Sequence, residues 1–198
     1  MKKILYFYSV VSPYSYLGTK KLLEISKKYS VEIIEKPINL VEKVFPATGG
    51  IPVPQRHISR QLYRNIELDR WTRYLNIKFN KKPKFWPPKD PHTPALFLIA
   101  SIELGKKMDF GFKVLEHIWA NEKDISSLDT MQLIANDLKI NFGELKKLAM
   151  SEKIKKIYED NTQEAINMNV FGVPTYIYNN EIFWGQDRLI FLEEALKN

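Results

Sequence analysis

The first forty residues contain two short apolar runs separated by a helical pattern. Residues 4–8 and 31–35 have the composition of strands, whereas apolar residues between 16 and 28 recur at helical spacing. A strand, a helix and a strand in this order form a βαβ unit, whose two strands are parallel and are joined by a right-handed crossover. We therefore expect a parallel strand pair at the start of the chain.

The pattern is almost wholly helical from residue 56 to residue 168. A short helix at 39–45 and an irregular stretch at 46–54, rich in glycine and proline, precede this block, and a loop at 81–94 interrupts it. No strand-like alternation occurs inside the block. The predicted helices cover residues 58–75, 95–104, 110–121, 129–138, 142–150 and 152–168.

The pattern changes again near the C-terminus. Residues 174–178 and 181–184 are predicted strands joined by Asn179-Asn180, because asparagine tolerates the positive φ of a hairpin turn. Gly185-Gln186-Asp187 then caps a last helix at 188–196. The chain therefore ends in strand, strand and helix.

This order of elements predicts the fold class. The sequence βαβ, many helices, ββα indicates an α/β protein with a thioredoxin-like fold and an inserted all-helical subdomain. Residues 1–45 together with 169–198 are the predicted thioredoxin-like domain, which is discontinuous in sequence. Residues 46–168 are the predicted insertion.

Composition narrows the class of protein. The 198 residues are 44% hydrophobic, which is enough for a full core, and no segment reaches the roughly 18 apolar residues of a membrane span. Met1-Lys2-Lys3 resembles the start of a signal peptide, but the apolar run after it is short and contains Tyr6 and Tyr8, which favours a strand. Because the chain has neither a signal nor a cysteine, we expect a cytoplasmic protein without a disulfide or a Cys-ligated metal.

Charge favours small anionic ligands. The formal net charge is +7, and that charge also suits nucleic acid. The basic region lacks a recognised nucleic-acid module and an interleaved aromatic platform, so we expect neither a nucleic-acid nor a membrane partner. No metal site is indicated, because His57, His92 and His117 lack metal-ligand spacing. The basic region comprises Arg56, Arg60, Arg64, Arg70, Arg73, Lys78, Lys81, Lys82 and Lys84.

Ser12-Pro13-Tyr14-Ser15 lies where the first strand meets the first helix. Ser12 can cap the helix and Pro13 suits its first position, so backbone N–H groups there favour an anion such as a thiolate. The spacing is that of the C-x-x-C redox motif with serine at both sulfur positions. Since serine forms no disulfide, a thiol at this site must arrive on a ligand, with Ser12 donating a hydrogen bond to its sulfur. The alternative is that Ser12 is an ordinary N-cap.

Pro174 begins the first C-terminal strand. Thioredoxin-like folds place a cis-proline there, facing the N-terminus of the first helix, and we expect a cis bond between Val173 and Pro174. The main chain of Val173 can then pair with a bound peptide such as γ-glutamyl-cysteinyl-glycine. The alternative is a trans proline on an edge strand.

Several motifs in order resemble one enzyme family. SPYSYLG at 12–18, FGVPT at 171–175 and FWGQDR at 183–188, together with PINL at 37–40 and ATG at 47–49, resemble the 2-hydroxychromene-2-carboxylate isomerases. These enzymes have a DsbA-like thioredoxin fold and are close relatives of the kappa-class glutathione transferases. The resemblance covers essentially the whole chain.

The resemblance implies a glutathione-dependent enzyme. Ser12 would lie beside the glutathione sulfur and stabilise its thiolate. Val173, with Pro174, would pair with the cysteinyl unit. Gln186 and Asp187 would hold the γ-glutamyl end, although Asp187 could instead serve only as the cap of the last helix.

Two positions of the expected glutathione site differ from the family. Gly50 stands where the family has an asparagine that contacts glutathione, and it offers only its backbone. Arg60 corresponds to a family lysine by its spacing from Tyr63. An arginine there could bind the glycyl carboxylate of glutathione through two parallel hydrogen bonds, or it could be a solvated charge.

The substrate side also differs. His92-Thr93 replaces an Asn-Thr pair of the isomerases, so His92 could orient an anionic substrate, carry a proton, or be an exposed loop residue. Trp86 and Trp184 are the expected substrate walls.

Three functions fit this pattern. The first is an isomerase in which the glutathione thiolate adds reversibly to an electrophilic aromatic or unsaturated carboxylate. The second is a kappa-class-like glutathione transferase, which would conjugate the electrophile, and the third is a non-catalytic thioredoxin-fold binding module. Relatives in this family are generally dimers, so the resemblance also implies a homodimer.

Overall fold

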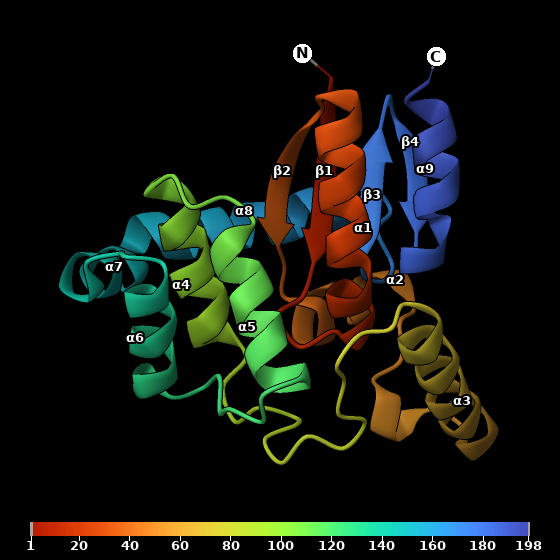
Figure 1. The fold of residues 1–198 in the computed structure, drawn as a ribbon, viewed down its shortest axis with the longest axis horizontal. Coiled ribbons are helices and arrows are strands. Elements are labelled where there is room, and N and C mark those ends of the chain that lie inside the picture. The colour runs from red at the N-terminus through yellow and green to blue at the C-terminus, as the bar shows by residue number, and fades with distance from the viewer. Residues whose placement is uncertain (1, 198) are drawn as a thin grey trace.

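A four-stranded mixed sheet lies at the centre of the computed structural model, which describes residues 2–197. Its strands are β1 (Lys3–Tyr8), β2 (Glu32–Pro37), β3 (Thr175–Tyr178) and β4 (Glu181–Trp184), in the spatial order β2-β1-β3-β4 (Figure 1). β1 is parallel to β2, whereas β3 is antiparallel to both β1 and β4. The predicted parallel pair and the C-terminal hairpin are therefore confirmed.

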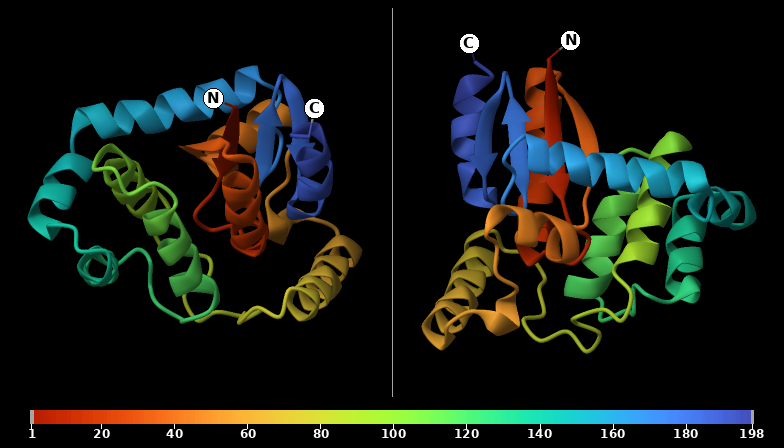
Figure 2. Two further views of the ribbon diagram at one scale, coloured as in Figure 1. Left: turned by 45° about the horizontal axis from the view of Figure 1, so that its top comes forward. Right: turned by 180° about the vertical axis from the view of Figure 1, so that it is seen from behind.

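Helices cover both faces of the sheet. α1 (Pro13–Tyr29) and α9 (Leu189–Ala195) lie on one face, and α8 (Glu152–Asn167) crosses the other (Figures 1 and 2). On one face Tyr6 stacks on Tyr8 and Tyr176, with ring centroids 4.3 and 5.3 Å apart. On the opposite face Phe7 and its neighbours pack with residues of α8 in a second core. This is the thioredoxin-like arrangement that the order of elements predicts.

Four further helices lie on the side of the β2 edge. They are α4 (His92–Glu103), α5 (Asp109–Trp119), α6 (Leu128–Asp137) and α7 (Phe142–Ala149) (Figure 1). The division into residues 1–45 with 169–198 and an insertion at 46–168 remains a proposal. The C-terminal half of α8, within the proposed insertion, reaches the sheet, because Asn161 Nδ2 donates to the carbonyl oxygen of Pro37 at 3.4 Å.

A buried carboxyl joins the helical block to the sheet. Glu35 on β2 accepts a hydrogen bond from Tyr8 Oη at 2.5 Å and another from the backbone N–H of Met108, just before α5. Burial raises the pKa of Glu35. An added Cβ at Gly111 would lie 2.4 Å from Tyr8 Oη, so this contact requires a residue without a side chain on α5.

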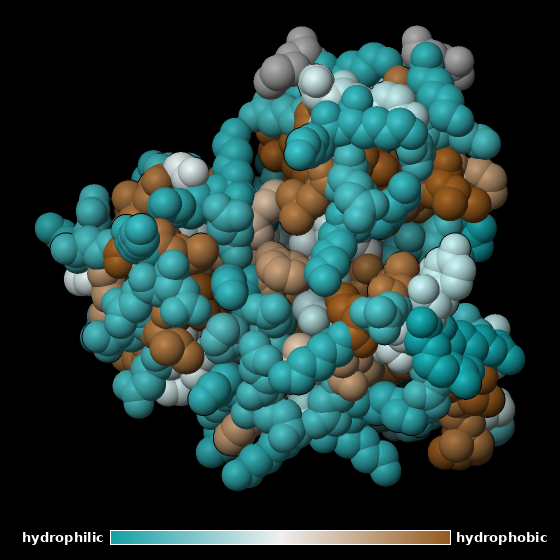
Figure 3. Space-filling view, in the orientation of Figure 1, coloured by the Kyte–Doolittle hydropathy of each residue, from teal (hydrophilic) through white to brown (hydrophobic). Residues whose placement is uncertain are grey.

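α3 (Ile58–Tyr74) stands apart from the rest of the molecule, at the lower right of Figure 1. Only Leu68 in this helix is buried. Apolar side chains are exposed along it, and Figure 3 shows hydrophobic surface over this region. They are Ile58, Leu62, Tyr63, Ile66 and Tyr74, each between 47% and 81% exposed.

Two predicted helix boundaries were wrong. Residues 46–54 are not fully irregular, because a π-helical turn (Leu40–Val44) continues into the short helix α2 (Phe45–Thr48), which Gly49 ends at φ 76°. α4 begins at His92 rather than Ala95, since Asp90 Oδ1 accepts hydrogen bonds from the first backbone N–H groups at 2.8 and 3.1 Å.

The predicted cap of the last helix was also wrong. A short 3₁₀ turn, Gln186–Arg188, comes first, and α9 has no side-chain cap. The Asp187 carboxylate instead lies 3.1 Å from Arg188 Nη2.

Within residues 2–197, none of the helices has both the length and the apolar character that a bilayer crossing needs.

Candidate active site

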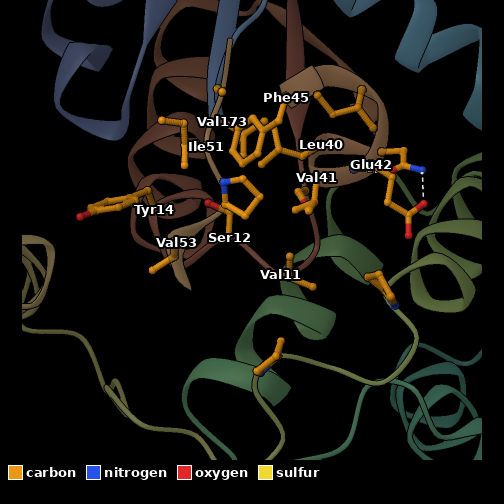
Figure 4. Close-up of a pocket in the computed structure, with 18 of the residues that line it drawn as sticks. Val11, Ser12, Tyr14, Leu40, Val41, Glu42, Phe45, Ile51, Val53 and Val173 are labelled. Atoms are coloured by element: carbon orange, nitrogen blue, oxygen red, sulfur yellow. Dashed lines mark hydrogen bonds between the residues drawn. The ribbon is translucent and has the colours of Figure 1, made fainter. Parts of the chain in front are cut away.

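A cavity of about 630 Å³ opens where β1 ends and α1 begins (Figure 4). Its lining comes from the β1–α1 loop, the segment after β2, α3, the loop before α4, α8 and the residues before β3. Three residues predicted for the site, Pro174, Gln186 and Asp187, do not line it. The predicted residues that line the cavity are Ser12, Gly50, Arg60, Trp86, His92, Val173 and Trp184.

Ser12 is the N-cap of α1. Its Oγ accepts a hydrogen bond from the backbone N–H of Ser15 at 3.2 Å, which confirms the predicted cap. Because the oxygen is the acceptor in this bond, the hydroxyl hydrogen stays available to an anion in the cavity. Ser15 does not line the cavity; it is fully buried, and its hydroxyl has no partner among residues 2–197.

Val173 lies on the same side of the cavity as Ser12 (Figure 4). The Val173–Pro174 bond is cis, as expected from the fold. The main-chain groups of Val173 form no hydrogen bond to residues 2–197. The carbonyl of the next residue, Pro174, accepts one from the Gly185 N–H at 2.9 Å. An extended peptide could therefore pair with Val173.

Two aromatic residues form one rim of the cavity. Phe171 and Trp184 meet edge to face with ring centroids 4.7 Å apart, and both are about half exposed. An added Cβ at Gly172 would lie 2.5 Å from Trp184 Nε1, so the indole rests directly on the backbone. This rim offers an apolar surface to a ligand.

Gln186 and Asp187 are not part of the cavity lining. A Cβ at Gly18 would be 3.0 Å from the Cβ of Gln186, which shows that Gln186 packs on the first half of α1. Asp187 has the neighbouring Arg188 as its ion-pair partner. The turn that carries both residues therefore lies next to α1.

Gly50 has a structural reason to lack a side chain. A Cβ built there would lie 2.0 Å from Cδ1 of the buried Phe45, and the Gly50 N–H donates to the Phe45 carbonyl at 3.0 Å. The ring of Phe45 occupies the space that an asparagine would need. A side chain at position 50 would therefore require the Phe45 ring to move.

Three arginines form one wall of the cavity. Arg60 and Arg64 are four residues apart in α3, a spacing that puts them on one face of the helix, and Arg56 lies in the extended segment just before it. All three line the cavity. None of them forms an ion pair with a carboxylate among residues 2–197. Arg60 is exposed, whereas Arg56 and Arg64 are partly buried and burial lowers the pKa of each.

His92 lies in the first turn of α4, opposite this wall. Its Nε2 is 3.2 Å from Glu42 Oε2, and its Nδ1 is 3.5 Å from Tyr158 Oη on α8. Glu42 also accepts a hydrogen bond from Asn39 Nδ2 at 3.0 Å. That bond and the nearby His92 lower the pKa of Glu42. His92 is therefore a helical residue in a polar group and not a free loop side chain.

A family model of the DSBA-like thioredoxin domain matches residues 3–197. The chain belongs to the DSBA-like thioredoxin family. This match confirms the predicted thioredoxin-like fold. The similarity of the chain to a 2-hydroxychromene-2-carboxylate isomerase, in sequence and in structure, confirms the resemblance seen in the motifs.

The DSBA-like relatives include isomerases and glutathione transferases. A 2-hydroxychromene-2-carboxylate isomerase of Pseudomonas sp. (strain C18) is 26% identical over 194 residues, covering 96% of this chain and 88% of the relative. Glutathione S-transferase kappa 2 of Caenorhabditis elegans is 27% identical over 180 residues, covering 87% and 79%. A solved 2-hydroxychromene-2-carboxylate isomerase structure has a TM-score of 0.82 and 23% identity, covering 98% of this chain and 94% of the other.

Within the DSBA-like fold, this chain has serines at the redox positions and contains no cysteine. The two serines at the C-x-x-C positions have different environments. Ser12 lines the cavity, whereas Ser15 is buried in the core. Only the first serine is therefore placed to act on a ligand.

Three residues that line this cavity were not predicted from the sequence. Glu42 and Tyr158 meet His92 from distant parts of the chain, and no spacing in the sequence signals that contact. Arg64 belonged to the recognised basic region, and its spacing from Arg60 was the signal that could have placed both on one wall.

Proposed function

We propose that the protein is a glutathione-dependent isomerase of the 2-hydroxychromene-2-carboxylate isomerase type. The observation that carries the proposal is Ser12, whose hydroxyl hydrogen is available at the N-terminus of a 17-residue helix and opens into the same cavity as Val173. The main chain of Val173 forms no hydrogen bond to residues 2–197. A hydroxyl donor and a helix N-terminus both favour a thiolate over a thiol.

The residues present suit glutathione. Val173, beside Pro174, offers main-chain groups that are free to pair with the cysteinyl unit. Arg60, which lines the cavity, suits the glycyl carboxylate. Gln186 and Asp187 lie outside the lining, so in this proposal the γ-glutamyl end extends past the cavity and its ammonium competes with Arg188 for the Asp187 carboxylate. Gly50 contributes only backbone, since Phe45 blocks a side chain there.

Each side chain then has a defined task. When bound, glutathione supplies a thiolate that adds reversibly to an unsaturated carbon of the substrate. Ser12 orients that sulfur and keeps it ionised by donating its hydroxyl hydrogen. Trp86 and Trp184 form walls for a planar substrate, and His92, paired with Glu42, is placed to orient it or to move a proton.

A kappa-class-like transferase is the second candidate, supported by the kappa relatives. Both chemistries use Ser12, so the site alone does not separate them. Turnover of 2-hydroxychromene-2-carboxylate at constant free glutathione supports the isomerase. Stoichiometric loss of glutathione with an electrophile supports the transferase, and a binding module would show neither activity.

Calorimetric titration with glutathione tests the proposal. Binding should be saturable, and Ser12→Ala should weaken it by about 1–3 kcal/mol, the contribution of a hydrogen bond to a charged sulfur. S-methylglutathione, which has no thiol, should lose most of this sensitivity. Ser127→Ala, which removes the N-cap of α6 away from the cavity, is the matched control.

No binding of glutathione at millimolar concentration, a free energy weaker than about −4 kcal/mol, would overturn the cofactor assignment. A non-catalytic module or another thiol would then be the working hypothesis. The proposed cellular compartment is the cytoplasm, where reduced glutathione is abundant.

We also propose that the protein is a homodimer. The exposed apolar side chains of α3, Ile58, Leu62 and Ile66, follow one another at helical spacing, and such a stripe is typical of an interface. The family resemblance supports the same assembly.

A further inference from the structure

Arg64 is the partly buried arginine of α3, and it forms no ion pair with any of residues 2–197. Arg70 Nη1 is 2.6 Å from Glu67 Oε1, and Asp69 Oδ1 is 2.7 Å from Lys81 Nζ. No carboxylate in residues 2–197 lies within ion-pair distance of Arg64. A partly desolvated cation without a counter-charge favours an anionic ligand.

Aromatic residues hold the Arg64 guanidinium in place. Its Cζ lies 5.5 Å from the ring centroid of Trp86, a cation–π distance. Trp86 Nε1 in turn donates to the carbonyl oxygen of Val11 at 3.3 Å, next to Ser12. The guanidinium and the indole are therefore fixed to the loop that carries the proposed thiolate-stabilising hydroxyl.

Tyr14 lies near the same guanidinium. Burial raises the pKa of the Tyr14 phenol, so it is neutral and can donate a hydrogen bond, but it supplies no negative charge to Arg64. Tyr14 and Arg64 both line the cavity. The positive charge of Arg64 thus has no counter-charge within ion-pair distance among residues 2–197.

We propose that Arg64 and Trp86 form a subsite for a planar unsaturated carboxylate, with Arg64 binding the carboxylate and the Trp86 ring holding the guanidinium in place. This inference rests on the proposed function, because it assigns the second substrate's carboxylate to Arg64 and leaves Arg60 for glutathione. A guanidinium matches a carboxylate through two parallel N–H···O bonds. The residue therefore sets specificity for acids over neutral electrophiles.

Calorimetric binding of chromone-2-carboxylate and of its neutral carboxamide, without glutathione, tests this subsite. The acid should bind more tightly than the amide. Arg64→Met should lower the affinity for the acid at least tenfold and leave the affinity for the amide within twofold. Arg64→Lys should retain part of the preference for the acid. Arg73→Met, an exposed position on the same helix outside the cavity, is the control and should change neither affinity.

A parallel glutathione titration separates this subsite from the cofactor assignment. If the acid binds through Arg64 but glutathione does not bind, the subsite stands and the cofactor assignment fails. If Arg64→Met weakens glutathione and not the acid, or if the acid shows no saturable binding to the wild type, the subsite is overturned. Thermal melts of each variant verify that it is folded.

Discussion

The backbone N–H of Ser15 donates to Ser12 Oγ at 3.2 Å, and this fixes the Ser12 hydroxyl as an acceptor toward its helix and a donor toward the cavity. Ser12→Ala removes both functions. We expect the free energy of unfolding to fall by about 1 kcal/mol because the cap is lost. We expect kcat to fall about 10²–10³-fold because the hydrogen-bond donor is lost. Urea melts and turnover of 2-hydroxychromene-2-carboxylate measure the two effects.

The control Ser127→Ala should show a similar stability loss without the loss of kcat. Equal losses of kcat in both variants would show that the effect arises from stability and not from the hydroxyl donor.

Gly50→Asn should destabilise the protein even though it restores the residue expected in the family. The new Cβ would lie 2.0 Å from the Phe45 ring, and moving a buried ring costs about 1–3 kcal/mol. The melting temperature measures this. Gly143→Ala, whose new Cβ would lie 3.3 Å from the capping oxygen Oδ1 of Asn141, needs a much smaller adjustment and should lower the melting temperature less. An unchanged melting temperature for Gly50→Asn would mean that the segment carrying Phe45 moves freely.

The buried Glu35 predicts a pH-dependent contribution to stability. Its pKa is raised by burial, so the folded state binds this proton more tightly than the unfolded state, whose carboxyl titrates near its ordinary value of 4.5. The free energy of unfolding contributed by Glu35 therefore falls as pH rises from about 4.5 through the raised pKa, by at most about 1.4 kcal/mol per pH unit.

Glu35→Gln removes this titration and can keep both hydrogen bonds, with its oxygen accepting from Met108 N–H and its amide donating to Tyr8 Oη. Urea melts from pH 5 to 8 should show the variant gaining stability relative to the wild type as pH rises. Parallel pH profiles of stability for the variant and the wild type would contradict a raised pKa of Glu35.

Leu62→Glu should dissociate the proposed dimer, because each association would bury two carboxylates without partners. We expect the dimer dissociation constant to rise at least 100-fold, as measured by light scattering over a dilution series. Ile190→Glu, an equally exposed apolar position on α9, should leave it unchanged. The reverse result would move the interface to α9.

The elements that sequence predicted well depend on local rules. The βαβ unit, the Ser12 cap, the hairpin at Asn179-Asn180 and the cis bond before Pro174 each follow from a few adjacent residues and the fold they imply. The start of α4 was wrong because a cap at Asp90 was not considered. Asp187 was also wrongly predicted as the cap of the last helix, because a 3₁₀ turn that contains it comes before α9.

The site was less predictable, because its contacts join distant parts of the chain. His92 meets Glu42 from 50 positions earlier in the numbering and Tyr158 from 66 positions later. Trp86 was expected as a wall, but its contact with Arg64 depends on how α3 and the loop at 81–94 pass each other. Such pairs become visible only when the backbone is placed in space.

The position of α3 has a consequence for how this protein could diversify. Leu68 is the helix's only buried residue, whereas Arg60 and Arg64 on the same helix line the cavity. Exposed substitutions usually change stability by less than about 0.5 kcal/mol, so most positions of α3 can vary while the sheet and its core stay intact. Ligand preference can therefore drift by replacing residues of one peripheral helix, with Ser12 and the chemistry it serves unchanged.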